Sequence, residues 1–445
     1  MPTFLSKIVA AVKQQAEMAT MAGWSFAAAL IARSANLIAL MICARVLSQE
    51  QFGQVAIMQS TVGMFGPIAG LGLSITTTKF LAEYRETDRV RAGRILALSL
   101  TVAVFAGALM TLALIALAPQ LASRGLGSAD LTRPLIQASG LLVLGVIESV
   151  QTGALTGLEA FSRIAKLSAW NGVLSLPVVA ILAKTNGAAG AIAGLTIALA
   201  WTCLLNGIIL RGECAKRGIR LSFSGWASER QVLFMFSFPA YVSGIVVAPI
   251  TWMTNALLVK QGGGLAEMAL FTAADRFRFL LIFVPISVSR IVVPTLARLR
   301  SAGDANGYKS ALRWNVGFGM LSTVPPVLIC MALSQPLMAL FGTSFAHGWP
   351  VLAILALSAI PTVLNTQLGA ALMSDNRAWA RTGTDALLSV TFFLCAWWLI
   401  PIWHASGLAM AFALAYTAAS ITLWICLRYQ PKAKAPAMQA VAAPV

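Results

Sequence analysis

The amino-acid sequence predicts an all-α integral membrane protein with twelve transmembrane helices. Of its 445 residues, 58% are hydrophobic and only 11% are charged, whereas a soluble domain carries about 25% charged residues. The hydrophobic residues gather in runs of about 20 residues, the length that a helix needs to cross a membrane. Because these runs lack the alternation of apolar and polar residues found in membrane β-strands, they predict helices, which satisfy their own backbone hydrogen bonds in lipid.

Twelve apolar runs follow one another along the chain, at 21–47, 54–82, 93–118, 134–157, 167–185, 190–211, 233–260, 268–297, 313–335, 350–373, 385–403 and 407–427. The first run is too long for the apolar core of a signal peptide. Residues 1–20 mix apolar and charged side chains, which predicts an amphipathic segment on the cytoplasmic membrane surface. Residues 428–445 are rich in Ala and Pro, which predicts a disordered cytoplasmic tail.

The net charge of +17 reports the orientation of the chain and not a nucleic-acid partner. With the N-terminus inside, 23 Lys and Arg residues fall on the cytoplasmic side and 5 on the outer side. This asymmetry follows the positive-inside rule and predicts that both termini are cytoplasmic. The basic residues are then expected to contact anionic lipid headgroups.

The chain is expected to divide into two bundles of six helices, 21–211 and 233–427, joined by a cytoplasmic linker at 212–232. An internal repeat supports the division, because Gln-Thr-Gly-Ala at 151–154 recurs as Gln-Leu-Gly-Ala at 367–370. Six helices are an even number, so both bundles enter from the same side and are related by a pseudo-twofold axis along the membrane normal. In transporters built from repeats, the substrate site lies near the midplane between them.

Four arginines lie well inside the apolar runs, away from the run ends: Arg33, Arg276, Arg278 and Arg290. A charge at the centre of a membrane costs about 2.5–3.5 kcal/mol on insertion scales, so such residues usually line an interior cavity. Asn36 lies one turn after Arg33 and is expected to share its cavity face. These residues predict a site for an anionic substrate, although Arg290 has the alternative of extending to the inner interface.

Two carboxylates well inside the runs, Glu148 and Asp275, are candidates for ion coupling, since a carboxylate in apolar surroundings can take up a proton. Each also has a structural alternative. Asp275 stands three residues before Arg278 and can form an ion pair with it on one helix face. Glu148 can neutralise Arg33.

Motifs for other chemistry are missing. The sequence has no GxxxxGK[ST], HExxH or GxSxG motif. Its six cysteines form no CxxC pair, and its two histidines are isolated, so no metal site and no cofactor are expected. We therefore expect a transporter and not an enzyme, driven by an ion gradient, by membrane potential or by consumption of its product.

Two stretches resemble a known family. The run RVLSQEQFGQVA (Arg45–Ala56) resembles the first outer turn of bacterial polysaccharide flippases, and GPIAGLGLSITTTKFLAEYR (Gly66–Arg85) resembles their second helix. These are the O-antigen and exopolysaccharide repeat-unit flippases. Their superfamily also holds the MATE drug exporters and the lipid II flippases.

The resemblance implies a MATE-like, V-shaped arrangement of two six-helix bundles around a cationic cavity in the bacterial plasma membrane. Family members move undecaprenyl-diphosphate-linked oligosaccharides from the inner to the outer leaflet, which also implies polysaccharide polymerases or glycosyltransferases as partners. Arginine suits a diphosphate because its guanidinium binds oxygen pairs and stays charged. Sugar rings are then expected to contact Gln59, Trp252 and Asn255.

Three alternatives remain open at this stage. A MATE-like drug exporter for cationic compounds would need cavity carboxylates to dominate, but arginines outnumber acids inside the runs. Lipid II flippases usually carry two additional helices. A membrane-embedded glycosyltransferase, ligase or polymerase would need a catalytic acid, a metal or a large outer loop, and the loops are short.

Overall fold

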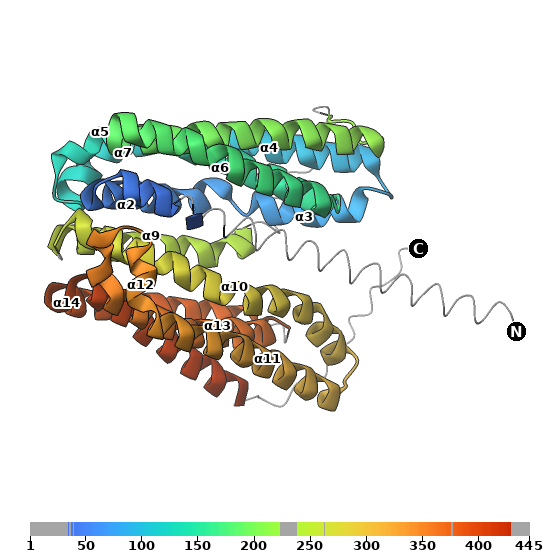
Figure 1. The fold of residues 1–445 in the computed structure, drawn as a ribbon. Helices are drawn as coiled ribbons and strands as arrows, with labels where there is room; N and C mark the ends of the chain where they lie inside the picture. The colour runs from blue at the N-terminus through green and yellow to red at the C-terminus, as the bar shows by residue number, and fades with distance from the viewer. Residues whose placement is uncertain are drawn as a thin grey trace, which may run out of the picture.

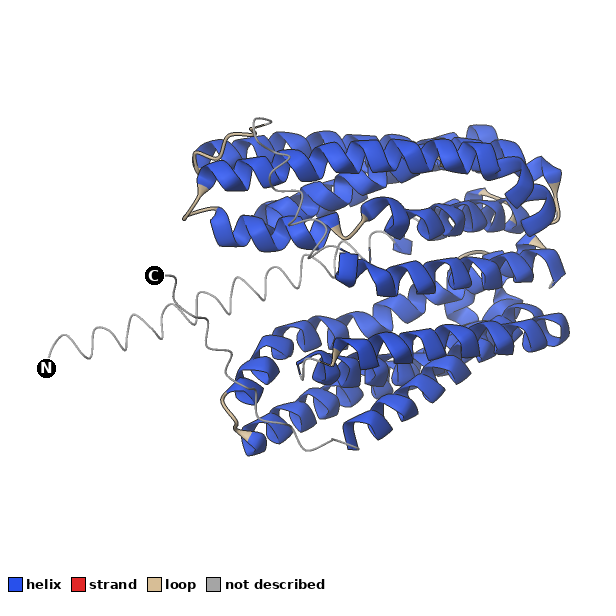
Figure 2. Ribbon diagram, turned by 180° about the vertical axis from the view of Figure 1, so that it is seen from behind, coloured by secondary structure: helices blue, strands red, loops and turns tan. Residues whose placement is uncertain are grey.

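The computed structural model describes residues 34, 37–38, 40–222, 238–261, 263–374 and 377–428, and this part of the chain is helical without strands (Figure 2). Its main helices are α2 (Gln49–Gly70), α3 (Leu73–Tyr84), α4 (Arg89–Gln120), α5 (Thr132–Ala138), α6 (Gly140–Gly157), α7 (Phe161–Lys216), α9 (Phe238–Gln261), α10 (Leu265–Ser301), α11 (Ala305–Ala332), α12 (Ser334–Ala339), α13 (Trp349–Ser374) and α14 (Ala378–Arg428). Short turns lie at η1 (Leu121–Gly125), η2 (Ala129–Leu131) and η5 (Thr343–Gly348). The all-α prediction is confirmed for these residues.

The helices pack in two groups. In the N-terminal group (α2–α7), α6 packs against α3, α4 and α7. In the C-terminal group (α9–α14), α13 packs against α10, α11 and α14. Figure 1 shows the two groups as layers, with α2 of one beside α9 of the other. Residues 1–20, residues 223–232 of the predicted linker and the tail after Arg428 fall outside the described residues, so the domain division stays a prediction.

Seven helices among the described residues are long and apolar enough to cross a membrane, and the bent pair α2–α3 can supply an eighth. Two of the seven are longer than one span requires. α7 has 56 residues and α14 has 51, which correspond to about 84 and 77 Å if straight, against about 30 Å of hydrocarbon. Both are interrupted: α7 at Asn186 and Gly187, and α14 at His404, where the backbone leaves helical geometry.

α2 and α3 meet at a bend of 45°. Leu71 and Gly72 both adopt positive φ there, at 45° and 67°. Glycine tolerates this region at no steric cost, so the Leu71-Gly72 pair ends one helix and starts the next. At its other end, α2 begins with a capping box in which Ser48 and Gln51 satisfy each other's backbone amides.

The two groups are joined mainly through α2, which packs against α9 and α10. Gly53 makes this approach possible, since a Cβ there would lie only 1.8 Å from the Leu265 carbonyl oxygen. Nearby, the Phe52 ring meets the rings of Phe341 and Phe345 edge-on at 6.2 and 5.8 Å. Nε of Arg45 donates to the Leu340 carbonyl at 2.8 Å. These contacts close the end of the molecule that the charge distribution assigns to the outer side.

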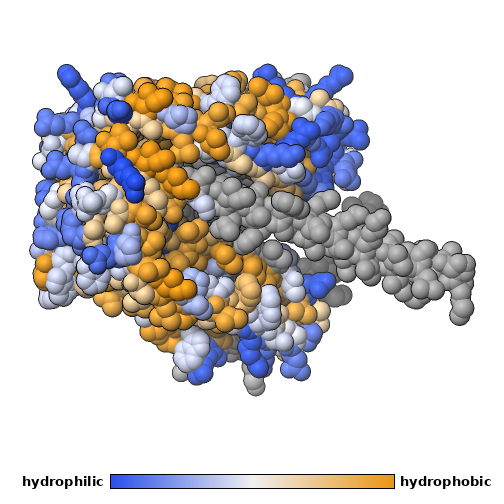
Figure 3. All heavy atoms as spheres, viewed as in Figure 1, coloured by the Kyte–Doolittle hydropathy of each residue, from blue (hydrophilic) through white to orange (hydrophobic). Residues whose placement is uncertain are grey.

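The surface of the molecule matches a membrane protein. A hydrophobic band crosses the helices between hydrophilic ends (Figure 3). Many large apolar side chains within helices are exposed on this surface, including Phe105, Leu321 and Trp398 at 72%, 74% and 77%. Apolar patches of this extent mark a membrane-contacting surface when they lie on long apolar helices.

Candidate functional site

Three consecutive polar residues of α2, Gln59, Ser60 and Thr61, form the candidate site, and we call them the α2 polar strip. Their side chains point to different sides of α2, which lies between α9 and α10. Nδ2 of Asn255 donates to the Ser60 hydroxyl at 2.8 Å, and Nε1 of Trp252 donates to the Thr61 hydroxyl at 2.9 Å. Both partners are buried residues of α9. The strip therefore ties the two groups together by side-chain hydrogen bonds.

Arg276 of α10 adds a further hydrogen bond between the two groups. We call this set of contacts between the α2 polar strip and α9 and α10 the joint. Nη2 of Arg276 donates to Oε1 of Gln59 at 3.1 Å. Its Nε is buried and has no partner among the described residues. Gln59 lies about 15 Å from the start of α2 and Arg276 about 16 Å from the start of α10, at 1.5 Å per residue. Both therefore lie at a similar distance along their helices, within the predicted apolar runs.

Asp275 and Arg278 form an ion pair within α10. Both Nε and Nη2 of Arg278 lie 2.7 Å from Oδ1 of Asp275. Arg278 is only 4% exposed, and its guanidinium lies over the rings of Phe412 and Phe279, at 4.3 and 4.8 Å from the centroids. This geometry favours the structural alternative for the pair. The role of Arg278 in substrate binding and of Asp275 in coupling stays a prediction.

Sequence reasoning missed a second ion pair in the C-terminal group. Arg381 Nη2 lies 2.8 Å from Asp385 Oδ1, and both side chains are largely buried. Arg381 Nη1 also donates to the Asn365 carbonyl of α13 at 3.2 Å. The close passage needs Gly369, because a Cβ there would lie 2.0 Å from Nη1. The i,i+4 spacing of the two charges was the available signal, but Arg381 was assigned to the inner surface.

Glu148 of α6 has a different environment. Its Oε1 accepts a hydrogen bond from the Thr152 hydroxyl at 2.7 Å, and Thr152 accepts a longer one, 3.5 Å, from Nδ2 of Asn206. Within the described part of the chain, Glu148 forms no ion pair. It is therefore a carboxylate inside an apolar helix whose hydrogen-bonding partners, among the described residues, are neutral.

Three predicted site residues lie beyond the description. Arg33 and Asn36 fall outside the described residues, and so does the side chain of Arg290, of which only the α10 backbone is given. The predicted pairing of Glu148 with Arg33 therefore stays a prediction. The structure brings together four of the other predicted residues at one joint, namely Gln59, Trp252, Asn255 and Arg276.

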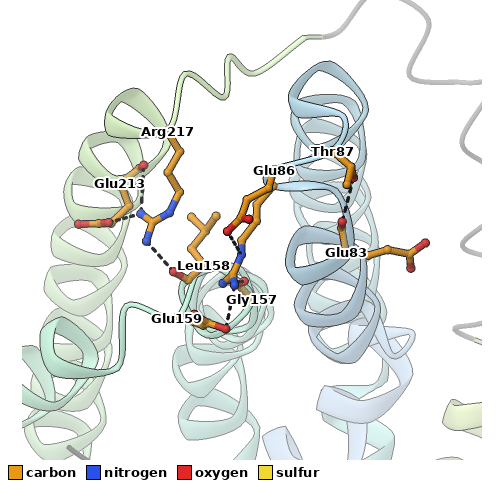
Figure 4. Close-up of polar contacts among 9 residues, drawn as sticks. Glu83, Glu86, Thr87, Gly157, Leu158, Glu159, Glu213 and Arg217 are labelled. Carbon is orange, nitrogen blue, oxygen red and sulfur yellow. Dashed lines mark hydrogen bonds and ion pairs between the residues drawn. The ribbon is translucent and has the colours of Figure 1, made fainter. Parts of the chain in front are cut away.

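A network of charges ties the end of the N-terminal group that the sequence assigns to the cytoplasm (Figure 4). The buried Glu213 carboxylate accepts from Arg163 Nε at 2.8 Å and from Arg217. Arg217 also donates to the Leu158 carbonyl at 2.8 Å. These contacts join α6 to both halves of α7.

Arg85 makes a parallel connection from the end of α3. Its Nη2 lies 2.9 Å from Glu159 Oε1, and its Nη1 donates to the Gly157 carbonyl at 3.3 Å. Figure 4 shows Arg217 reaching the Leu158 carbonyl, with Gly157 and Glu159 nearby at the end of α6. Because the network lies within one group, it stabilises that group and does not link the two.

No cluster of His, Cys, Asp or Glu suitable for a metal ion is found among the described residues. The joint instead offers one guanidinium with a free Nε, surrounded by amide, hydroxyl and indole groups. Such a set can hold an anionic group by charge-assisted hydrogen bonds and can contact hydroxyl-rich rings.

Comparison with known proteins decides the family. The sequence model of the family described as "Polysaccharide biosynthesis protein" matches residues 19–300, well over half of the chain. The chain belongs to this family. A second model, that of the lipid II flippase MurJ, matches residues 168–443. The family membership confirms the resemblance drawn from the outer turn and second helix.

Named relatives point in the same direction. The chain is 26% identical over 340 residues to the succinoglycan biosynthesis transport protein ExoT of Rhizobium meliloti, a match that covers 76% of this chain and 65% of that protein. It is 23% identical over 402 residues to the EPS I polysaccharide export inner membrane protein EpsE of Ralstonia nicotianae, covering 87% and 88%.

Solved structures share the fold. An inward-facing multidrug resistance MATE family transporter of the MOP superfamily superimposes with a TM-score of 0.74, at 16% identity, over 88% of this chain and 93% of that one. The lipid II flippase MurJ in its inward closed conformation superimposes with a TM-score of 0.69, at 15% identity, over 91% and 88%. The MATE-like fold expected for this family member is confirmed.

Proposed function

We propose that the chain is a flippase that moves undecaprenyl-diphosphate-linked oligosaccharide repeat units from the inner to the outer leaflet of the bacterial plasma membrane for surface polysaccharide synthesis. Its family membership and the transport and export proteins among its relatives support this class of substrate. The observation that supports the proposal is Arg276, which lies in the joint between the groups and whose Nε has no partner among the described residues.

The diphosphate takes the place of Gln59 as the partner of Arg276. A guanidinium donates two parallel hydrogen bonds to a phosphate, and in a site with little water this interaction is stronger than the neutral one it replaces. Releasing Gln59 removes one of the bonds between α2 and the C-terminal group. Substrate binding therefore loosens the joint that closes the outer side, as alternating access requires.

The proposed architecture has twelve spans in two bundles of six with both termini cytoplasmic. The interruptions at Asn186–Gly187 and at His404 support it, because each divides a helix of double length into two spans. Labelling tests the orientation. Cys214 is buried and unsuited to an aqueous reagent, whereas Ala215 is exposed. Ala215→Cys should react with an impermeant maleimide in inverted vesicles and not in intact cells; the reverse pattern refutes the topology.

The decisive experiment complements a deletion strain of the source bacterium in trans. Arg276→Gln should lower surface polysaccharide about tenfold or more, as expected for loss of a charged hydrogen bond, with lipid-linked repeat units accumulating on the inner leaflet. Arg276→Lys should restore part of the export, because the charge remains without the planar fork. Arg313→Gln, at an exposed position of α11, is the matched control. Normal export by Arg276→Gln contradicts the proposal.

A lipid II flippase is the second candidate, because the MurJ model matches residues 168–443. Both substrates are polyprenyl-diphosphate sugars, so the same Arg276 serves either. Rescue of a strain depleted of its lipid II flippase, without any change in surface polysaccharide, would replace the first proposal by this one. Polysaccharide polymerases and glycosyltransferases are the partners that the first proposal implies, since they supply and consume its substrate.

A further inference from the structure

A groove in the N-terminal group lies away from the joint. α4 and α7 each pack against α6, and a cavity of about 250 Å³ lies between them. Leu96 and Leu100 of α4 and Leu204 and Ile208 of α7 form its apolar walls. Leu204 and Ile208 are 55% and 58% exposed, and the helices that α7 packs against, α2, α5 and α6, all belong to its own group. The groove therefore opens toward lipid.

Two polar side chains of the groove have no partner. Gln151, from α6, is 9% exposed, and its Oε1 is buried without a hydrogen-bond partner among the described residues. Arg211, from α7, is exposed at the rim and makes no ion pair with any residue that the structure describes. The Gln151 Nε2, which is a hydrogen-bond donor, also has no partner among the described residues and lies against Gly207 of the groove. The groove therefore offers this donor to a ligand that carries an acceptor.

The two groups can be compared residue by residue at this place. In the N-terminal group, a Cβ on Gly190 would lie 1.8 Å from the Leu182 carbonyl oxygen. In the C-terminal group, a Cβ on Gly407 would lie 2.2 Å from the Leu399 carbonyl oxygen. Each glycine thus closes the same turn between two half-helices, and 217 residues separate both pairs. This spacing aligns the second half of α7 with the second half of α14.

With this alignment, Gly207 corresponds to Trp424 and Arg211 to Arg428. In the C-terminal group, the Arg428 guanidinium lies 3.8 Å from the centroid of the Trp424 ring. In the N-terminal group, the glycine leaves the position without a side chain and the arginine has lost its ring. The groove is therefore the place where the N-terminal group lacks a side chain that its counterpart supplies.

The glutamines of the internal repeat differ in the same way. In the C-terminal group, Nε2 of Gln367 donates to the Asn315 carbonyl at 3.0 Å and lies against Gly319 of α11. In the N-terminal group, Gln151 instead lies against Gly207, with Nε2 at 3.4 Å from where a Cβ would stand. Its amide thus faces the groove and is free to bind a ligand.

We propose that this groove binds one anionic glycerophospholipid of the cytoplasmic leaflet. Arg211 lies about 7.5 Å from the end of α7, at 1.5 Å per residue, and Gly207 and Gln151 lie one turn deeper. Arg211 holds the phosphate, the Gln151 amide donates to an ester carbonyl, and the acyl chain follows Leu204 and Leu100 into the membrane. Phosphate, ester and hydrocarbon occur in this order in a phospholipid.

The combination of an anionic headgroup and an ester carbonyl distinguishes this ligand from the transported lipid and from zwitterionic phospholipids. A polyprenyl phosphate also offers a phosphate to Arg211, but it carries no ester carbonyl for Gln151. A zwitterionic phospholipid has the ester but a weaker attraction to the arginine, since anionic headgroups add about 1 kcal/mol per basic residue near the surface. The inference uses the orientation proposed above but does not depend on which substrate the protein transports.

Native mass spectrometry of the full-length protein tests the proposal, with phosphatidylglycerol, phosphatidylethanolamine and undecaprenyl phosphate each added as the probe. The wild type should retain one phosphatidylglycerol in preference to phosphatidylethanolamine. Arg211→Gln and Gly207→Trp should each lower this retention about tenfold, the effect of losing one charged hydrogen bond or the space for the ligand. Arg313→Gln and Ile181→Trp, both at exposed positions, should retain it.

Three results would overturn the proposal: retention without preference for phosphatidylglycerol, equal loss in Arg211→Gln and Arg313→Gln, or displacement of phosphatidylglycerol by undecaprenyl phosphate. The last outcome would assign the groove to the carrier lipid. If Gly207→Trp fails to fold, Arg211→Gln and Gln151→Leu decide the question, because Arg211 is exposed and leucine retains the volume of the glutamine.

Discussion

The two helix groups handle charge inside the membrane in different ways. The C-terminal group carries two internal ion pairs, Asp275 with Arg278 and Asp385 with Arg381. The N-terminal group carries Glu148 within its helices, and the described hydrogen-bonding partner of that carboxylate is neutral. Its own ion pairs gather instead at the end of the bundle, around Glu213.

The carboxylates of the two groups therefore differ in their partners. Asp275 and Asp385 each contact a guanidinium, whereas the described partner of the Glu148 carboxylate is the Thr152 hydroxyl. The coupling roles predicted for Glu148 and Asp275 stay predictions, and substitutions at these positions test them.

The largest effect is expected from breaking the buried pair of the C-terminal group. Asp275→Asn should destabilise the protein by about 3 kcal/mol, because it leaves the Arg278 charge buried without its counter-ion. Thermal unfolding in detergent and the amount of protein in membranes measure the loss. Arg278→Met in the same chain should restore most of it, while Glu50→Gln, at an exposed position, should change neither. Unchanged stability of Asp275→Asn would show that the pair is not structural.

A smaller effect is expected at the second pair. Asp385→Asn should cost about 1–2 kcal/mol, since Arg381 keeps its hydrogen bond to the Asn365 carbonyl and both side chains retain some solvent contact. The same unfolding assay measures this change. A loss as large as that of Asp275→Asn would mean that the two pairs act as one network, and a double mutant would then show a smaller loss than the sum.

The smallest effect on stability is expected at Glu148. Glu148→Gln keeps an acceptor for the Thr152 hydroxyl, so the unfolding temperature should change by less than the effect of about 1 kcal/mol expected for a neutral hydrogen bond. In a reconstituted flipping assay, however, transport should lose its dependence on a pH gradient while substrate binding stays intact. If protein abundance falls instead, and Arg33→Gln restores it, the residue is the counter-ion of Arg33. Gradient-dependent transport that survives the substitution removes Glu148 from the mechanism.

Several site residues could be predicted because their cost is visible in the sequence. Arg276 lies in an apolar run, where a charge is energetically costly and usually marks function. In the structure it donates a hydrogen bond to Gln59. Ser60 and Thr61 escaped notice, although both bond across the joint, because hydroxyl residues occur in many membrane helices bonded to their own backbone. The pair of Arg381 with Asp385 was missed because Arg381 lies before the predicted apolar run at 385–403 and was therefore counted among the cytoplasmic charges.

The repeated Gln-x-Gly-Ala motif shows the same limit. The sequence identified the repeat but not its physical basis, which differs between the groups. Gly153 lets the Ser74 backbone of α3 approach, with a Cβ distance of 2.5 Å to its carbonyl oxygen, whereas Gly369 makes room for the Arg381 guanidinium. The glycines at equivalent positions of the repeat thus make room for different neighbours in the two groups.

The sequence by itself predicted the all-helical membrane class and the family, which are confirmed, and it named Arg276 as a candidate cation, whose role stays a prediction. These follow from composition, run length and local motifs, since every span must satisfy its backbone within itself. Only the tertiary structure decided which charges are neutralised and which stay free, because that depends on which helix faces lie together. It also decided that Gly207 opens a groove in one group where Trp424 occupies the corresponding position in the other. Such a difference depends on the neighbours that a side chain meets after folding, and no local pattern records them.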